Sequence, residues 1–217
     1  MKLSPVFSVL LAACLCAAAP ALAEDAESAL QRSDALYEKG DYPAALALVQ
    51  PLAEQGNAPA QYKLGLLYAE GHGVPKKEAE AVKWYRKAAK LGYAPAQYNL
   101  GGAYQYGKGV SRSASEAAKW YLESAAQGFA DAQFALGNLY RTGEGVRQSD
   151  MQAFIWYQKA AEQGHAQAQT NFGAMYLAGR AVPQNIDVAE RWFKRAAEQG
   201  DANAFKGLDL IRQLRGR

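Results

Sequence analysis

The feature that most constrains the fold of this chain is an internal repeat with a period of 36 residues. Five copies of the pattern Gly-x-Ala-x-Ala open on Gly56, Gly92, Gly128, Gly164 and Gly200, with no insertion or deletion between them. A period of this length is typical of solenoids, in which each unit covers the apolar face of its neighbour. We therefore expect stacked units that share one extended core.

Each copy contains the patterns of two helices. In residues 60–68, apolar side chains fall at i, i+4, i+7 and i+8, and in residues 81–89 they fall at i, i+3, i+4, i+7 and i+8. Both spacings place an apolar stripe on one face of a helix. Residues 71–75, Gly-His-Gly-Val-Pro, separate the two helices, because glycine releases the backbone and proline cannot continue a helix. The unit is predicted to be a helical hairpin.

Positions that do not vary between the copies are those that stacking is expected to require. A glycine recurs in the middle of the first helix, where it costs about 1 kcal/mol relative to alanine, so we expect a close approach between helices. The tryptophans of the second helix are expected to pack in the core, and truncation of one to alanine should cost about 3–5 kcal/mol. These structural positions are Gly65, Tyr68, Trp84, Gly101, Tyr104, Trp120, Gly137, Tyr140, Trp156, Gly173, Tyr176 and Trp192.

The complete unit resembles a known repeat family. From Gly56 to about Gln199, the unit follows the pattern G-x-A-x-A-Q-x-x-L/F-G-x-x-Y-x-x-G-x-G-V-P, and then A-x-x-W-Y/F-x-x-A-A. This pattern is similar to the Sel-one-like repeat (SLR), a relative of the tetratricopeptide repeat (TPR). The resemblance implies an all-α, right-handed α-solenoid of stacked helix-turn-helix repeats, a TPR/SLR-like superhelix with an inner surface for protein partners. Many bacterial relatives are exported and act in envelope assembly, signalling or host contact.

Two departures from the family pattern matter. The cysteine-rich branch of the family closes each hairpin with a disulfide, and some of its members carry β-lactamase labels, but this chain lacks those cysteines. In the last full repeat, Ala181 replaces the second loop glycine that stands as Gly73, Gly109 and Gly145 in the other copies. We expect that loop to be wider or more mobile.

The first residues are predicted to be a secretory signal peptide. Lys2 precedes an apolar run, and Ala21-Leu22-Ala23 supplies the small residues of a cleavage site, so we expect cleavage after Ala23 and a periplasmic or secreted protein. The alternative is a lipobox that ends at Cys14, which would give an outer-membrane lipoprotein with a lipid anchor on that residue. Cleavage after Ala23 removes Cys14 and Cys16, so the mature chain would have no disulfide and no transmembrane segment.

The repeat frame divides the chain into seven parts. The two ends keep a hairpin or helix pattern but depart from the repeat, as capping units of solenoids do. The parts are a signal peptide over 1–23, a degenerate N-terminal capping hairpin over 24–55, four repeats over 56–91, 92–127, 128–163 and 164–199, and a C-terminal capping helix over 200–217.

Charge and residue patterns argue against several functions. The formal net charge is +3, and Lys and Glu alternate along the helices, which does not suit a nucleic-acid binder. His72 and His165 lie two to three repeats apart, so we do not expect them to share a metal ion, and their variation between copies suggests solvent-facing positions. We see no catalytic motif and expect no cofactor and no enzymatic activity.

Binding residues are expected where the copies differ. In the related TPR hairpin the first helix lines the concave side, which carries over to three columns of residues in this chain. The columns are Tyr62, Tyr98, Phe134 and Thr170; Leu66, Gly102, Asn138 and Ala174; and Ala69, Gln105, Arg141 and Leu177. From them we select seven partner-binding residues for a concave groove: Tyr62, Leu66, Tyr98, Gln105, Phe134, Asn138 and Arg141.

Two interpretations of the aromatic column remain open at this stage. Its rings could be interface anchors, since aromatic residues and arginine are enriched at binding hot spots, or they could pack against the next helix. The sequence as a whole predicts an exported scaffold or adaptor that binds a protein or peptide. The alternative, based only on cysteine-rich relatives, is a hydrolase of the cell wall or of β-lactams.

Overall fold

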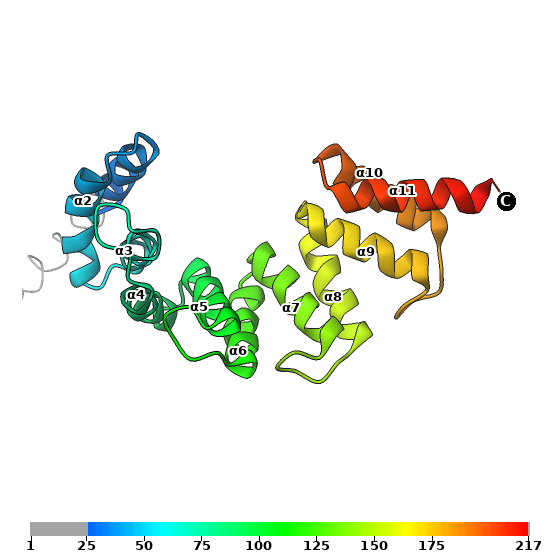
Figure 1. Ribbon diagram of the computed structural model, residues 1–217, viewed down its shortest axis with the longest axis horizontal. Helices are drawn as coiled ribbons and strands as arrows, with labels where there is room; N and C mark the ends of the chain where they lie inside the picture. Colours follow the sequence, from blue (N-terminus) through cyan, green and yellow to red (C-terminus); the bar gives the residue numbers. More distant parts are fainter. Residues whose placement is uncertain (1–25, 217) are drawn as a thin grey trace, which may run out of the picture. The chain divides into compact units, whose positions relative to one another are not determined.

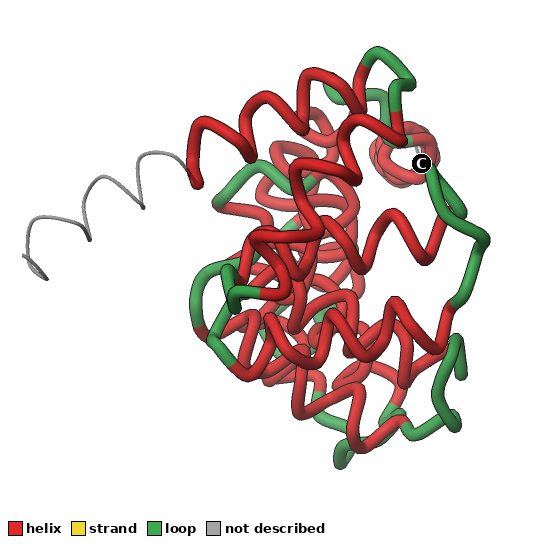
Figure 2. Tube along the Cα trace, turned by 90° about the vertical axis from the view of Figure 1, so that its left-hand side faces the viewer, coloured by secondary structure: helices red, strands yellow, loops and turns green. Residues whose placement is uncertain are grey.

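The computed structural model describes residues 26–216, and these form helices joined by short loops, with no strand among them (Figure 1, Figure 2). The predicted signal peptide, with its alternative cleavage sites at Ala23 and Cys14, lies outside the described residues. A first helix covers 26–38. The helices that follow are α2 (Tyr42–Glu54), α3 (Ala58–Glu70), α4 (Glu78–Lys90), α5 (Ala94–Tyr106), α6 (Ala114–Ala126), α7 (Ala130–Thr142), α8 (Asp150–Glu162), α9 (Ala166–Ala178), α10 (Ile186–Glu198) and α11 (Ala202–Arg215).

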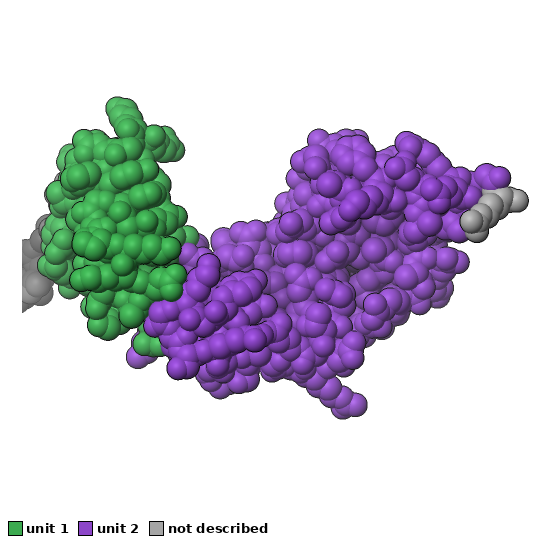
Figure 3. Space-filling model, viewed as in Figure 1, with its two compact units in different colours: residues 1–88 green, residues 89–217 purple. Residues whose placement is uncertain are grey.

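The chain divides into two compact units, residues 1–88 and residues 89–217 (Figure 3). In the first unit, α2 packs against α3. In the second unit, α5 packs against α6, α7 against α8 and α9 against α10, while α6, α8 and α10 each pack against the helix that follows them. Packing between consecutive helices confirms the all-α repeat solenoid that the period predicts.

Local sequence signals begin and end the helices at the same registers in successive copies. The second helices start at Ser113, Ser149 and Asn185, whose side-chain oxygens accept hydrogen bonds from backbone N–H groups at the start of the helix, at 3.3, 3.2 and 3.0 Å. The first helices end at a glycine, for example Gly143, which adopts a left-handed conformation (φ +77°) that closes the last turn. These caps fix helices of equal length at equal spacing.

The loop of the last full repeat keeps the shape of its counterparts. Ala181 has φ +65°, close to the +73° of Gly145 at the same register. Ala181 therefore keeps the left-handed backbone of the glycine that it replaces, and greater mobility of this loop stays a prediction. An L-residue such as alanine adopts this left-handed conformation at a cost of about 1–2 kcal/mol.

Two mid-helix glycines of the second unit, Gly101 and Gly137, make room for a tyrosine ring. A Cβ on Gly101 would lie 2.7 Å from a ring carbon of Tyr121, and a Cβ on Gly137 would lie 2.7 Å from a ring carbon of Tyr157. Tyr121 and Tyr157 are 2% and 0% exposed. The tyrosine after each tryptophan is thus the deeper core residue, and the glycine permits the first helix to lie directly on it.

Three of the four tryptophans are more peripheral than the core position predicted for them. Trp156 is 9% exposed, and Trp84, Trp120 and Trp192 are half-buried. Each indole occupies the outer part of its second helix, because the neighbouring tyrosine or phenylalanine fills the centre of the hairpin. The predicted core role therefore applies in full only to Trp156.

In repeats two to four, a buried glutamine of the first helix pairs with the glutamine that follows the second helix and also bonds to the backbone of the preceding repeat. The buried Gln133 donates from Nε2 to the carbonyl oxygen of Ala125 (3.2 Å), and its Oε1 accepts from Nε2 of Gln163 (2.8 Å). The same pairing joins Gln97 to Gln127 at 2.7 Å and Gln169 to Gln199 at 2.9 Å. Because every buried polar atom of these pairs has a partner, the amides add specific hydrogen bonds to the apolar stacking.

In the first repeat this pairing is incomplete. Nε2 of Gln61 donates to the carbonyl oxygen of Ala53 (3.1 Å), but Oε1 of Gln61 is buried and accepts no hydrogen bond. Thirty residues further on, where the other copies place glutamine, the sequence has Leu91.

Candidate functional site

Three pockets lie on the face of the first helices, and each contains one of the predicted partner-binding residues. The pocket with Arg141 lies between α7, α8 and α9 and has a volume of about 280 Å³. The pocket with Gln105 has a volume of about 360 Å³, and the pocket with Leu66, in the first unit, about 220 Å³. Leu66 and Ala174 of the second column and Gln105 and Arg141 of the third therefore line pockets, whereas Gly102, Asn138, Ala69 and Leu177 line none of the three.

A hydrogen-bond network shapes the Arg141 pocket. The hydroxyl of Tyr157 donates to Oδ1 of Asn138 (2.7 Å) and accepts from Nε of Arg141 (3.3 Å). Nδ2 of Asn171 also donates to Oδ1 of Asn138, at 3.4 Å. Arg180 lines the same pocket, but its guanidinium is held elsewhere. Asn138 is thus the acceptor that fixes the groups around the pocket.

The two guanidinium groups of this pocket differ in their partners. Arg180 forms a two-pronged pair with Asp150, at 3.1 and 2.7 Å. Arg141 is exposed, and within residues 26–216 the only hydrogen bond of its side chain is the one from Nε to Tyr157, so its terminal nitrogens have no carboxylate partner. An arginine of this kind, oriented on one side and free on the other, is suited to bind a carboxylate in two-pronged geometry.

The Gln105 pocket is polar. The hydroxyl of Tyr121 donates to Oε1 of Gln105 (2.8 Å), and Nε of Arg112 donates to its backbone oxygen (3.0 Å). Nη2 of Arg112 also pairs with Glu144 at 2.8 Å. Tyr106 stands beside them with two thirds of its surface exposed, 67%. This pocket presents an exposed ring beside an ion pair that is already satisfied.

The Leu66 pocket is smaller and more apolar. Leu66, Leu67 and Val49 form its apolar lining, and an ion pair between Lys63 and Asp34 stands at its edge. The buried Ser33 donates to a backbone oxygen of α2 at 3.3 Å. The pocket can accept an apolar side chain.

The aromatic column has a different environment. Tyr98 lies 5.6 Å from Tyr121 and 5.4 Å from Phe129, measured between ring centroids, and Phe134 stacks on His165 at 4.6 Å. Tyr62, Tyr98 and Phe134 are half-buried, and none of them lines the three pockets. These contacts are those of the packing interpretation, while the role of this column in partner binding remains a prediction.

Burial raises the pKa of the hydroxyl groups of Tyr98, Tyr121 and Tyr157 above the ordinary value for tyrosine. For Tyr157 the adjacent Arg141 acts in the opposite direction. The hydroxyls of Tyr121 and Tyr157 are therefore protonated at neutral pH and donate hydrogen bonds to Gln105 and Asn138, respectively.

The histidines serve local structure. His165 is the N-cap of α9, where its Nδ1 accepts from the backbone N–H of Ala168 at 3.2 Å, and its side chain is only 15% exposed. His72 stacks on Tyr42 with ring centroids 3.9 Å apart. Both are more enclosed than the solvent-facing positions that their sequence variation suggested. In the described part of the chain, no three His, Cys, Asp or Glu side chains gather to form a metal site.

These features define a helical-repeat protein with pockets on the face of its first helices. Comparison with known protein families identifies the family. The Sel1 repeat matches residues 58–93, 94–129, 130–165 and 166–201. The chain belongs to the Sel1 repeat family. The matched copies have the same period as the repeat described above and begin two residues later than our frame.

Solved structures agree with this assignment. A protective antigen of uropathogenic Escherichia coli strains with an SLR fold is 38% identical, with a TM-score of 0.79, over 84% of this chain and 40% of that chain. A Sel1 repeat protein from Oxalobacter formigenes is 36% identical, with a TM-score of 0.76, over 82% of this chain and 74% of that one. A Sel1 repeat protein from Klebsiella pneumoniae, at 21% identity and a TM-score of 0.57, shares the fold.

The chain spans less than half of the E. coli antigen. No curated protein matches the chain. Across residues 26–216, the helices are too short or too polar to cross a membrane.

Proposed function

We propose that this protein is an exported scaffold or adaptor that binds a protein or peptide segment on the face of its first helices. Membership in the Sel1 repeat family supports the scaffold role, because such repeats commonly mediate protein–protein interaction. Envelope assembly, signalling or host contact are the settings we propose for it. The predicted signal peptide supports an exported location.

The observation that carries this proposal is the arrangement around Arg141. A surface arginine gains affinity for a partner when its orientation is fixed before binding, because less conformational freedom is then lost. The hydrogen bond from Nε of Arg141 to Tyr157 supplies that orientation, and Asn171 offers an amide beside it. We infer that a carboxylate of the partner binds the terminal nitrogens of Arg141, while flanking side chains of the partner enter the neighbouring pockets.

Arg141→Gln is the sharpest test of this face. It removes the charge of a residue that is exposed, so the fold should be retained, whereas alanine at Tyr98 and Phe134 would also remove packing contacts. Arg147→Gln is the matched control, since Arg147 is exposed and lines none of the three pockets. The measurement is quantitative affinity capture from envelope extracts of the source cells.

We expect a partner that is retained by the wild-type protein and by Arg147→Gln and is lost with Arg141→Gln. Equal capture by all three proteins would show that the first-helix face around Arg141 does not bind the partner.

The N-terminus determines where the scaffold acts. We propose cleavage after Ala23, which leaves Glu24 as the first residue of a periplasmic or secreted protein. Mass spectrometry of the mature protein distinguishes this from an outer-membrane lipoprotein that begins with a lipid-modified Cys14.

We propose no catalytic role. Hydrolysis of nitrocefin or of muropeptides by the purified protein, abolished by substitution of one polar residue, would instead establish the hydrolase alternative.

A further inference from the structure

A cation covers three of the four tryptophans of the chain. In each case it is the side chain three residues after the tryptophan on the same helix, so that it lies one turn further along the same face. The pairs, with the distance from the charged group to the ring centroid, are Lys87 over Trp84 (3.7 Å), Lys159 over Trp156 (4.4 Å) and Arg195 over Trp192 (4.8 Å).

The second repeat reverses the charge at this position. Trp120 is followed after three residues by Glu123, and within residues 26–216 no lysine or arginine lies over its ring. The same register of the fold therefore presents an aromatic face without its internal cation, next to a carboxylate.

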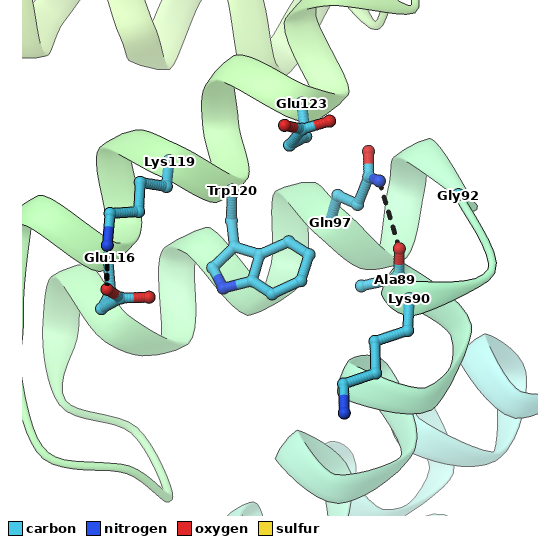
Figure 4. A pocket seen from close by; sticks show the side chains of 8 residues that line it. All are labelled: Ala89, Lys90, Gly92, Gln97, Glu116, Lys119, Trp120 and Glu123. Atoms are coloured by element: carbon cyan, nitrogen blue, oxygen red, sulfur yellow. Dashed lines mark hydrogen bonds and ion pairs between the residues drawn. The ribbon is translucent and has the colours of Figure 1, made fainter.

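Trp120 borders a pocket of about 440 Å³ (Figure 4). The indole lies in the middle of the pocket, with the carboxylate of Glu123 on one side and the side chain of Lys90 extending on the other (Figure 4). The floor includes Gln97, whose amide is already bonded to Ala89 at 3.2 Å and to Gln127 at 2.7 Å. The pocket is thus open at the indole and closed by satisfied groups at its base.

Two charged groups of the pocket have no ion pair within residues 26–216: the carboxylate of Glu123 and the ammonium of the exposed Lys90, which lie on different sides of the indole (Figure 4). Lys119 is paired with Glu116 at 2.5 Å, which satisfies both. Glu123 is exposed and has no ion pair or side-chain hydrogen bond within the described residues. A ligand that carries a positive charge would contact the ring of Trp120 and the carboxylate of Glu123 together.

We propose that this pocket binds an arginine side chain of a partner protein. A cation over an indole is attracted by the negative face of the ring, and the planar guanidinium can stack on that face while it donates two hydrogen bonds to a carboxylate. Arg195 over Trp192 shows that the repeat accommodates a guanidinium over its tryptophan. In the second repeat the partner supplies the cation that the other repeats supply themselves.

This site is separate from the face assigned to the proposed function. Its lining comes from α6, from Gln97 and from the end of α4 with the loop that follows, and it contains no residue of the three columns. The proposal therefore stands or fails independently of the Arg141 pocket.

The test uses ¹⁵N-labelled protein and the N–H signals of its four indoles. N-acetylarginine methylamide is titrated against its uncharged analogue, N-acetylcitrulline methylamide, at matched ionic strength. We expect a saturable shift of the Trp120 signal with the arginine compound alone, with a dissociation constant of the order of tens of millimolar, because one exposed cation–π contact and one ion pair are each weak.

Two variants at exposed positions sharpen the result. Glu123→Lys restores the internal cation of the other repeats and should abolish the shift of Trp120. Lys87→Glu gives the first repeat the chemistry of the second and should make the Trp84 signal responsive. The proposal is wrong if citrulline produces the same shift, if all four indoles respond alike, if Glu123→Lys leaves binding unchanged, or if N-acetyllysine methylamide binds more tightly than the arginine compound.

Discussion

Two adjacent glycines of α5 should respond in opposite directions to the same substitution. Gly101 lies against the ring of Tyr121, where a Cβ would stand 2.7 and 2.8 Å from two ring carbons. Gly102 is its neighbour in the same helix, and the nearest atom to a Cβ there is the hydroxyl oxygen of Tyr121, at 3.6 Å. Gly101→Ala must displace a buried ring, whereas Gly102→Ala fits into the space that exists.

The magnitudes follow from two opposing terms. Alanine favours the helix over glycine by about 1 kcal/mol, and both variants gain this. Carbon atoms in contact prefer separations of about 3.5–4.0 Å, so Gly101→Ala requires a shift of nearly 1 Å in a ring that Gln105 holds by a 2.8 Å hydrogen bond. Overpacking of a core typically costs about 1–3 kcal/mol. The difference leaves Gly101→Ala destabilised by up to about 2 kcal/mol, whereas we expect Gly102→Ala to stabilise by up to about 1 kcal/mol.

Urea unfolding followed by circular dichroism at 222 nm measures both effects, with the slope of the transition checked for a change in cooperativity. Combining Gly101→Ala with Tyr121→Ala should remove most of the steric penalty and so reveal coupling between the two positions. If both alanines stabilised the protein equally, the close approach between glycine and ring would not be what holds these helices at their spacing.

Three further outcomes follow from the same contacts. Gln163→Leu should cost about 1–3 kcal/mol in urea unfolding, because it leaves the buried Oε1 of Gln133 without a donor; an unchanged midpoint would show that the glutamine pair contributes nothing. Ala181→Gly should raise stability by about 1 kcal/mol by relieving the left-handed backbone, and a lower melting temperature would contradict this. Burial raises the pKa of Tyr121 and Tyr157 above the value near 10 that tyrosine has in the unfolded chain. The unfolded state therefore loses these protons first, and the stability of the fold should decrease as the pH rises above about 10. Phenylalanine at both positions should reduce this decrease in unfolding curves measured over a pH series.

The helices could be predicted because their signals are local. The 36-residue period, the glycines that end the first helices and the cap residues that begin the second ones act within a few positions along the chain. The glycine of the middle of the first helix also indicated close approach. The ring that lies against this glycine is the tyrosine and not the tryptophan before it. This choice depends on the rotation of the two helices about their axes, which no local sequence pattern predicts.

For the candidate binding site, the sequence predicted the face of the solenoid on which it lies but not the hydrogen bonds within it. The registers of Leu66, Gln105 and Arg141 were identified from variation between copies, and these residues line pockets. The hydrogen-bond network around Arg141 was not predicted. Asn171 belongs to the following repeat, and it contacts Asn138 only because the two repeats stack on each other. The other copies do not place asparagine at both of these registers, so the sequence carries no repeated signal for this network.

For the aromatic column, the sequence left the anchor and packing interpretations open. In the structure, His165, one repeat later, stacks on Phe134, a contact of the packing kind. Coverage of a surface residue by the next hairpin depends on side chains that vary from copy to copy. For that reason, a column of exposed-looking aromatics in a solenoid is weak evidence for a groove.

Site-specific photocrosslinking in cells tests the central claim most directly, namely that the first-helix face around Arg141 binds a protein partner. p-Benzoylphenylalanine replaces Ala174, an exposed residue that lines the Arg141 pocket, and, as a control, Met151, which is 50% exposed on the second helix α8. The account predicts a discrete crosslinked product from position 174 that disappears with Arg141→Gln and is absent from position 151. A product from position 174 that persists without Arg141, or the same product from both positions, would contradict it.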